Sequence, residues 1–216
     1  NVNKHGHVVE PSFRVPSFSE IAITRPAAAD AFALPMVPVG RLMRLSPGES
    51  QRHRVRTGGV VTRRLSDTMF FLRDGSLGLK VETRRPVSFR SGDVVEAAGF
   101  PEMSEGLAVL QQAIARLVSA GAPPAPVQPT MAALIDGTHN SDLVTIRARL
   151  VDWAVTGANV TLIFQAGDHL FKGLLNKASS APVALPEKNS LVDVTGVCII
   201  SELEDIWFYQ PRSFVL

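Results

Sequence analysis

The chain has 216 residues, of which 45% are hydrophobic and 19% charged, and its net charge at neutral pH is +2. This composition is typical of globular domains with an apolar core, and the length allows one or two of them. Near-average glycine (16) and proline (15) contents exclude collagen-like and wholly disordered chains. No apolar run approaches the roughly 18 residues of a transmembrane helix, and the single cysteine, Cys198, excludes an internal disulfide.

Charge is distributed unevenly along the chain. Residues 1–37 carry 3 basic and 3 acidic side chains, residues 38–124 carry 13 and 8, and residues 125–216 carry 6 and 9. The middle is therefore basic, and most of its cations are arginines. Such a stripe can attract phosphates or acidic ligands, although a solvated, arginine-rich face on strands is the more ordinary interpretation.

The beginning of the chain resembles the end of a structural unit. Phe13 and Phe208 are each followed three residues later by a proline, within segments of similar composition. We therefore expect residues 1–37 to hold the terminal strand of a preceding unit and a linker. A coincidental terminal arm that contains phenylalanine and proline is the alternative.

Proline clusters divide the rest of the chain. Pro35 and Pro38 mark one break and residues 121–129 a stronger one, because proline lacks an amide donor and disfavours a helix before it. The segments 38–124 and 125–216 share sequence elements in the same order, at offsets of roughly 90–97 residues. The matched pairs are 54–62 with 144–152, 70–75 with 162–167, Lys80 with Lys172, and 92–99 with 189–196.

Both segments have the periodicity of strands. Residues 145–150 alternate polar and apolar side chains, and residues 161–165 are short and rich in β-branched types. Asp74-Gly75 fits a hairpin turn, and Gly58-Gly59 inside a strand-like run indicates a bend or bulge. Helical turns are expected where each segment opens, over 40–45 and 131–135.

Residues 107–118 are ambiguous. Their apolar side chains fall at helical spacing among strong helix formers, so propensity predicts a helix. Measured from Gly99, however, the stretch occupies the place that the strand-like residues 205–210 occupy from Gly196. We therefore predict a strand over 109–118, with tertiary context overriding propensity.

Each segment thus contains a short helical lead-in and five strands, the number expected for a Greek-key barrel. A loop, 83–90 or 176–186, takes the place of a helix between the third and fourth strands. We predict an all-β protein of two tandem, five-stranded barrels of the oligonucleotide/oligosaccharide-binding (OB) type, over 38–124 and 125–216.

The strand and glycine patterns of 54–62, 69–81 and 92–101, with Gly196-Val197-Cys198 near the end of the second unit, resemble a known family. They are similar to tandem OB-like modules in the extracytoplasmic sensor regions of bacterial membrane-bound histidine kinases and diguanylate cyclases. The resemblance covers nearly the whole chain. It implies a periplasmic fragment of a membrane protein, attached to the membrane through segments outside this chain.

Residues 54–99 also resemble the anticodon-binding OB domain of class II aminoacyl-tRNA synthetases and helicase-type OB folds. In that pattern an outward aromatic side chain and an arginine on strands two and three contact bases. Alternation places Phe70 and Leu72 inward and Phe71 and Arg73 outward. The resemblance implies that Phe71 stacks on a base and that four cationic side chains contact phosphates. The candidate ligand-binding residues are Arg56, Arg63, Phe71, Arg73 and Lys80.

Constellations for catalysis or metal binding are not evident in the sequence. His5 and His7 have no cysteine or carboxylate at ligand spacing, and the carboxylates over 202–205 fit a solvated loop. Cys198 lies on a strand pattern and fits a small, buried apolar residue. Phosphate-binding and nucleophile-elbow motifs are absent from the sequence. We expect no enzymatic activity, no cofactor and no metal.

The sequence therefore favours a non-catalytic ligand-sensing or protein-interaction module of a larger signal-transduction protein, such as a two-component system. A small ligand or a protein partner would bind the barrel face or the cleft between the units, and the last strand, over 208–216, would transmit the change. The alternative is a single-stranded nucleic-acid-binding protein that uses the basic first barrel. A structural spacer that binds nothing is a third interpretation.

Overall fold

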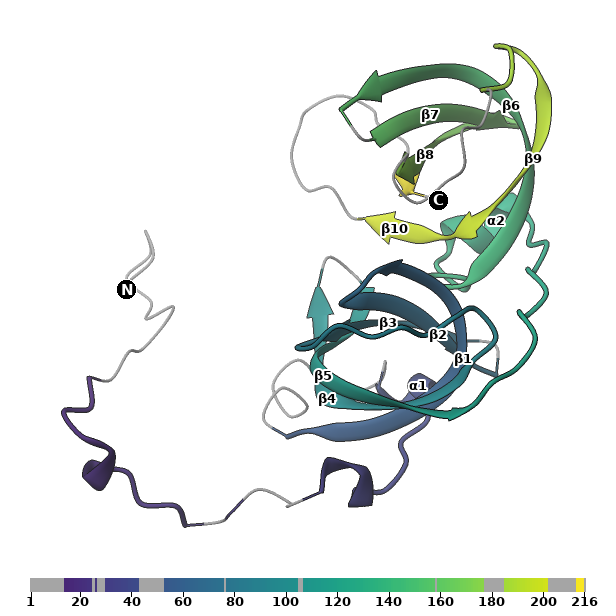
Figure 1. The fold of residues 1–216 in the computed structure, drawn as a ribbon. Coiled ribbons are helices and arrows are strands. Elements are labelled where there is room, and N and C mark those ends of the chain that lie inside the picture. The colour runs from purple at the N-terminus through teal and green to yellow at the C-terminus, as the bar shows by residue number, and fades with distance from the viewer. Residues whose placement is uncertain are drawn as a thin grey trace.

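The computed structural model describes residues 14–24, 26, 30–42, 53–75, 77–104, 107–157, 159–176, 185–201 and 213–215. They form a mostly β structure of two units, joined by an extended segment over 120–130 (Figure 1). No helix in this described part is long and apolar enough to cross a bilayer.

The first unit is a closed five-stranded barrel. Its strands are β1 (Val55–Ser66), β2 (Met69–Asp74), β3 (Leu77–Thr83), β4 (Val94–Ser104) and β5 (Leu107–Ser119). They pair in the order β1-β2-β3-β5-β4, β4 returns to β1, and β3 runs parallel to β5. Residues 84–93 connect β3 to β4 without a helix, which confirms the predicted loop.

The first strand of this barrel serves two neighbours because it bends. Its first half, 55–60, pairs with β4, and its second half, 60–66, pairs with β2. Gly59 lies at the junction, where a Cβ atom would lie 2.4 Å from the carbonyl oxygen of Arg73 on β2. Only a residue without a side chain permits that approach. The bend predicted from Gly58-Gly59 is therefore confirmed.

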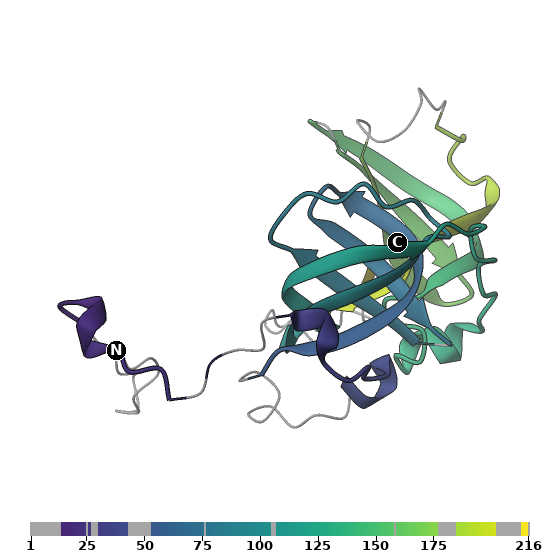
Figure 2. The same cartoon turned by 60° about the horizontal axis from the view of Figure 1, so that its bottom comes forward.

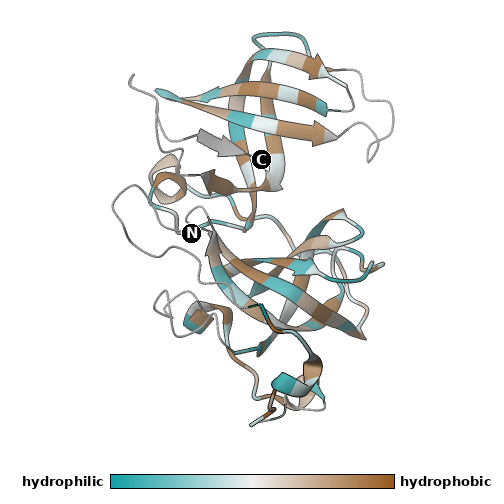
Figure 3. Ribbon diagram, turned by 90° about the vertical axis from the view of Figure 1, so that its left-hand side faces the viewer, coloured by the Kyte–Doolittle hydropathy of each residue, from teal (hydrophilic) through white to brown (hydrophobic). Residues whose placement is uncertain are grey.

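Alternating side chains along the strands build the barrel core. Phe70 and Leu72 of β2 point inward with Val81 of β3, and all three are completely buried. The ring of Phe89, from the loop after β3, meets Phe70 edge-on at 5.4 Å between centroids. Figure 3 shows the same alternation of hydrophobic and hydrophilic residues along the strands of both units.

The ambiguous stretch 107–118 is a strand, as predicted from its position in the repeat. It pairs with β4 on one side and with β3 on the other, so both neighbours hold it extended. A bulge at Gln112, whose φ is +50°, shifts the register. The inward side chains consequently fall at 108, 110, 113 and 115, a spacing that mixes periods of two and three and resembles a helix in the sequence.

The second unit is a curved six-stranded sheet. Its strands are β6 (Leu143–Thr156), β7 (Asn159–Ala166), β8 (His169–Asn176), β9 (Leu191–Val197), β10 (Ile199–Ser201) and β11 (Ser213–Val215). The order is β10-β11-β8-β7-β6-β9. Its core contains the stacked rings of Phe164 and Phe171, 5.3 Å apart, together with the buried Cys198.

A second closed barrel was the sequence expectation, whereas the strands described here form an open sheet. The pairing nevertheless repeats that of the first unit. β9 pairs with the first strand of its unit as β4 does, β10 pairs with β11, and β11 runs parallel to β8 as β5 does to β3. Only Cys198 separates β9 from β10, and residues 202–212, which precede β11, lie outside the described residues.

A short helix opens each unit, as predicted. α1 (Val39–Leu42) buries Val39 and Leu42 in the barrel, and residues 43–45 of its predicted range lie outside the described residues. α2 (Met131–Ile135) matches its predicted range, begins at the Thr130 N-cap and buries Leu134.

The segment before α1 differs from its prediction. Residues 14–24 contain the 3₁₀ turn η1 (Phe18–Glu20) and no strand, and every one of their side chains is exposed. The segment extends away from the barrel in both views (Figures 1 and 2). A second turn, η2 (Ala31–Ala33), packs on β1 and β4. The predicted terminal strand is therefore not found in 14–24, and residues 1–13 lie outside the described residues.

The bend in β1 can be tested with Gly59→Ala. We expect a loss of about 1–3 kcal/mol in the free energy of unfolding, because the methyl group overlaps the Arg73 carbonyl. The matched control is Gly157→Asn, at a turn glycine with φ of +58° and open space around it, which should change little. Urea unfolding followed by circular dichroism measures both, and equal stability of the two variants would contradict the role of Gly59.

Candidate ligand-binding cleft between the two units

Two of the five predicted site residues are held in ion pairs within the barrel. Arg56 donates to Glu96 at 2.6 Å and to the Leu34 carbonyl at 3.1 Å. Lys80 lies 2.8 Å from Glu82 on its own strand. The hydrogen bond from Arg56 is the main cause that lowers the pKa of Glu96 below its usual value; burial opposes the shift and Arg116 adds to it. Arg56 therefore has a structural role, attaching the lead-in segment to β1.

Phe71 and Arg73 face out of the barrel, as alternation predicts, but they do not face solvent. Phe71 is completely buried, and the side chain of Arg73 is only 14% exposed. The second unit covers this face of β2, so the predicted stacking of Phe71 on a base does not fit the structure. The sequence predicted the direction of these side chains correctly and missed what lies over them.

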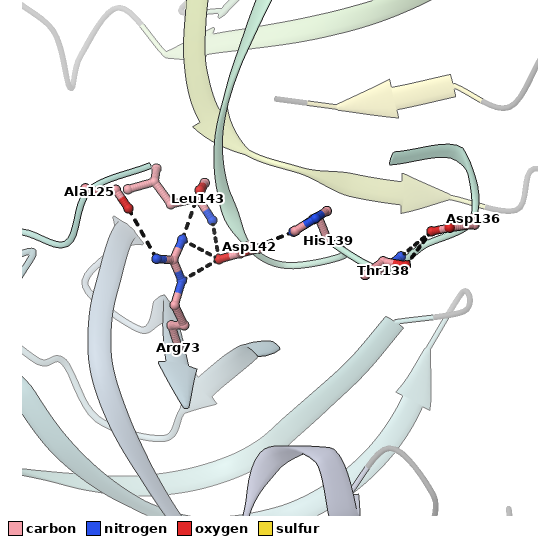
Figure 4. Close-up of polar contacts among 7 residues, drawn as sticks. All are labelled: Arg73, Ala125, Asp136, Thr138, His139, Asp142 and Leu143. Atoms are coloured by element: carbon pink, nitrogen blue, oxygen red, sulfur yellow. Dashed lines mark hydrogen bonds and ion pairs between the residues drawn. The ribbon is translucent and has the colours of Figure 1, made fainter. Parts of the chain in front are cut away.

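Arg73 is the main polar link between the units (Figure 4). Its Nε donates to Oδ1 of Asp142 at 2.6 Å, Nη2 to the Leu143 carbonyl at 2.9 Å, and Nη1 to the Ala125 carbonyl at 3.2 Å. The Asp142 side chain is only 1% exposed. A cation on the barrel thus neutralises a buried carboxylate of the second unit and also binds the linker.

The turn before β6 presents Asp142 to Arg73. The amide of Leu143 donates to Asp142 Oδ1 at 2.8 Å, and His139 Nδ1 lies 3.3 Å from Oδ2. On the barrel side, Gly78 allows a close approach, since a Cβ atom there would lie 2.1 Å from the Ser141 carbonyl oxygen. Ser141 itself has a φ of +64°. Both backbones are therefore shaped for this contact.

A cleft of about 370 Å³ lies between the units beside this link. The barrel contributes Arg63, Leu65 and Phe71. The second unit contributes mostly apolar side chains from β7 to β10: Asn159, Leu174, Leu175, Thr195, Gly196, Val197 and Ile199. Leu65 and Leu174 remain 48% and 55% exposed, so apolar surface is open to a ligand from both sides.

The cleft brings together two of the predicted residues, Arg63 and Phe71, which are direct neighbours across β1 and β2. Arg63 is exposed, and no carboxylate among the described residues pairs with it. Arg73 lies two positions from Phe71 on the same strand, whereas Arg56 and Lys80 do not line the cleft.

Sequence reasoning missed the leucines of this cleft because it searched for cations and aromatic rings. The signal that would have found Leu174 is alternation on β8. Phe171 and Gly173 are buried, so Leu170 and Leu174 occupy outward positions where a soluble strand usually carries polar side chains. Two outward leucines on one strand indicate a surface with a partner or a ligand.

Another concavity, of about 420 Å³, lies on the barrel wall at the bulge of β5. Phe100, Pro101, Glu102, Gln111 and Gln112 line it. Arg84 already donates to the Gln112 side chain at 2.5 Å, and Arg54 lies over the Phe100 ring at 5.3 Å. These side chains already interact with one another around the bulge, so we favour the cleft between the units as the candidate binding site.

The potential nucleophile and the potential metal ligands do not form a site within the described residues. Cys198 is buried as predicted, and burial, with a smaller effect of Asp142, raises the pKa of its thiol to about 12. The described residues contain no cluster of three or more potential metal ligands. His5, His7 and the carboxylates over 202–205 lie outside the described residues.

No family model and no curated protein matches the chain. Solved structures to which the chain is similar include a murine DNA-binding protein bound to double-stranded DNA (7% identity, 74% of this chain and 92% of that chain, TM-score 0.39). Another is the p202 HIN1 domain in complex with a 12-mer double-stranded DNA (10%, 76% and 89%, TM-score 0.38). A third is fission yeast Pot1 with single-stranded DNA (10%, 79% and 82%, TM-score 0.27).

The link between the units can be tested with Arg73→Met. We expect a loss of about 3–5 kcal/mol in the free energy of unfolding, because Asp142 would remain buried without its cation. The control is Arg147→Met, which removes an exposed pair with Asp193 at 2.8 Å and should change stability little. Urea unfolding monitored by circular dichroism distinguishes them, and similar effects for both variants would refute the special role of Arg73.

Proposed function

We propose that this chain is a non-catalytic module of a larger signal-transduction protein and that it binds a small ligand between its two units. The observation that carries the proposal is the cleft beside the Arg73–Asp142 link, with exposed leucines on both walls and the completely buried Phe71 among its lining residues. A cleft of about 370 Å³ is within the usual range of small-molecule sites.

The position of the cleft suggests how binding is transmitted. A ligand there contacts both units at once, so it stabilises the packing arrangement to which it binds more tightly. Ile199, which lines the cleft, pairs with Val215 of β11. The cleft is therefore adjacent to β11, and this pairing supports the proposal that the last strand transmits the change.

The cellular setting belongs to the same proposal. A periplasmic location, and membrane attachment through segments outside this chain, rest on the sequence resemblance to sensor regions of membrane-bound kinases and cyclases. A protein partner at the same cleft is the other form of this function that the sequence allows.

The cleft can be tested with a neutral apolar dye, N-phenylnaphthylamine, whose fluorescence rises in an apolar site. We expect Leu174→Gln to weaken dye binding about tenfold, because a leucine side chain of the binding surface is lost. The control is Leu170→Gln, on the same face of β8 and 46% exposed but outside the cleft. Equal effects of the two substitutions, or none, would exclude the cleft as the binding site.

A second candidate function, binding of single-stranded nucleic acid, rests on the end of the barrel where the 84–93 loop runs along β1. Arg64 donates to the Val87 carbonyl and Ser91 to that of Thr62, which holds the two segments together. The arginines exposed on these segments are Arg63, Arg64, Arg84, Arg85 and Arg90. Among the described residues, a carboxylate pairs only with Arg64, through Asp67 at 2.8 Å. Such a surface suits phosphate groups better than bases, since Phe71 is buried and Phe89 packs on Phe70.

This candidate predicts that the double variant Arg85→Glu/Arg90→Glu weakens binding of a short single-stranded oligonucleotide at least tenfold, with a shallower salt dependence. The double variant Arg147→Glu/Arg149→Glu, at two exposed arginines of the second unit, changes the net charge by the same amount and is the control. Fluorescence anisotropy measures both. Absence of submicromolar binding by the unmodified protein at about 0.15 M salt would rule the candidate out.

A further inference from the structure

The chemistry of the cleft identifies a class of ligand, and this inference rests on the cleft proposed above as the binding site. Its exposed apolar lining comes from both units, with Leu65 on the barrel 48% exposed and Leu174 opposite 55% exposed. Burial of hydrocarbon against these side chains is favourable in proportion to the apolar area removed from water. The body of the ligand is therefore apolar.

Arg63 is the cation of the cleft lining. Its direct cross-strand neighbour is Phe71, so the arginine and the aromatic residue occupy adjacent positions on the barrel side of the cleft. The nearby cations are engaged elsewhere: Arg64 pairs with Asp67, and Lys80, which is opposite Phe71 on β3, pairs with Glu82. No carboxylate of the described residues neutralises Arg63.

Among the residues that the structure describes, no acidic side chain lines the cleft to balance that charge. The polar side chains of the lining, other than Arg63, are Asn159 and Thr195, and the hydroxyl of Thr195 already shares a hydrogen bond of 2.7 Å with Thr145. A guanidinium presents several donors in a planar fork that matches a carboxylate or a phosphate. The cleft thus places one cation beside apolar side chains.

We propose that the cleft binds a small anionic amphiphile, with its apolar chain between the two units and its single anionic head on Arg63. A volume of about 370 Å³ is at the lower end of the range for small-molecule sites, which suits a medium-length chain rather than a membrane lipid with two tails. Each methylene that enters the cleft should tighten binding about fourfold.

The test compares three probes with the same octyl chain, nonanoate, octyl phosphate and octanol, by ligand-observed NMR titration of the intact protein. We expect at least one of the two anions to bind about tenfold more tightly than octanol, because a charged head gains a charge-assisted hydrogen bond. The two anions distinguish a carboxylate from a phosphate ligand. Arg63→Gln should remove this preference and leave octanol binding unchanged, and Arg63→Lys should retain part of it.

The control is Arg149→Gln, which removes an exposed arginine of the second unit outside the cleft and should leave all three affinities unchanged. Equal or tighter binding of octanol would overturn the ligand class and leave the cleft standing as an apolar site. Binding of none of the probes would overturn the ligand class too. The neutral-dye experiment with Leu174→Gln and Leu170→Gln then decides whether the proposed function fails with it. An anion preference that survives in Arg63→Gln would also refute the role of Arg63.

Discussion

The arrangement of the two units depends on one buried ion pair, Arg73 with Asp142. Removing both charges from water is costly, and their attraction offsets that cost only where further hydrogen bonds satisfy the remaining donors and acceptors. Here the Leu143 amide donates to the carboxylate, and two backbone carbonyls accept from the guanidinium. The pair can form only because Gly78 and the turn at Ser141 let the two backbones approach. It therefore determines which face of the barrel is covered.

Covering that face changes what the barrel can do. The outward side of β2 carries Phe71 and Arg73, which the sequence presented as a surface for bases and phosphates. In the structure the second unit occupies this surface, so the barrel contacts its own chain where a nucleic-acid-binding OB domain would contact its ligand. What remains accessible is the margin of the contact, where Leu65, Leu174 and Arg63 line the cleft, and the arginine-rich end of the barrel.

The sequence predicts the fold better than it predicts the residues of the candidate ligand-binding site, and the reason is physical. Local patterns determine where strands begin, bend and turn, and the internal repeat provides a second prediction for each element. For β5 the repeat predicted a strand although the local sequence favours a helix, because the bulge at Gln112 produces a helix-like spacing of apolar residues. Pairing between distant side chains has no local pattern. Arg56 and Glu96 are 40 residues apart and Arg73 and Asp142 are 69 apart, so counting charges could not distinguish engaged arginines from free ones.

An arginine that forms an ion pair, Arg73, and one that does not, Arg63, lie on neighbouring strands of the same barrel face. This proximity would couple ligand binding in the cleft to the packing of the two units. Arg73 holds the units together two positions from Phe71, whose neighbour across the strand pair is Arg63. In the function proposed here, a ligand between Leu65 and Leu174 would add contacts on the open side of a junction whose other side is held by an ion pair and close backbone contact. Such a ligand would change the packing of the two units only to the extent that the apolar walls fit it better in one arrangement than in another.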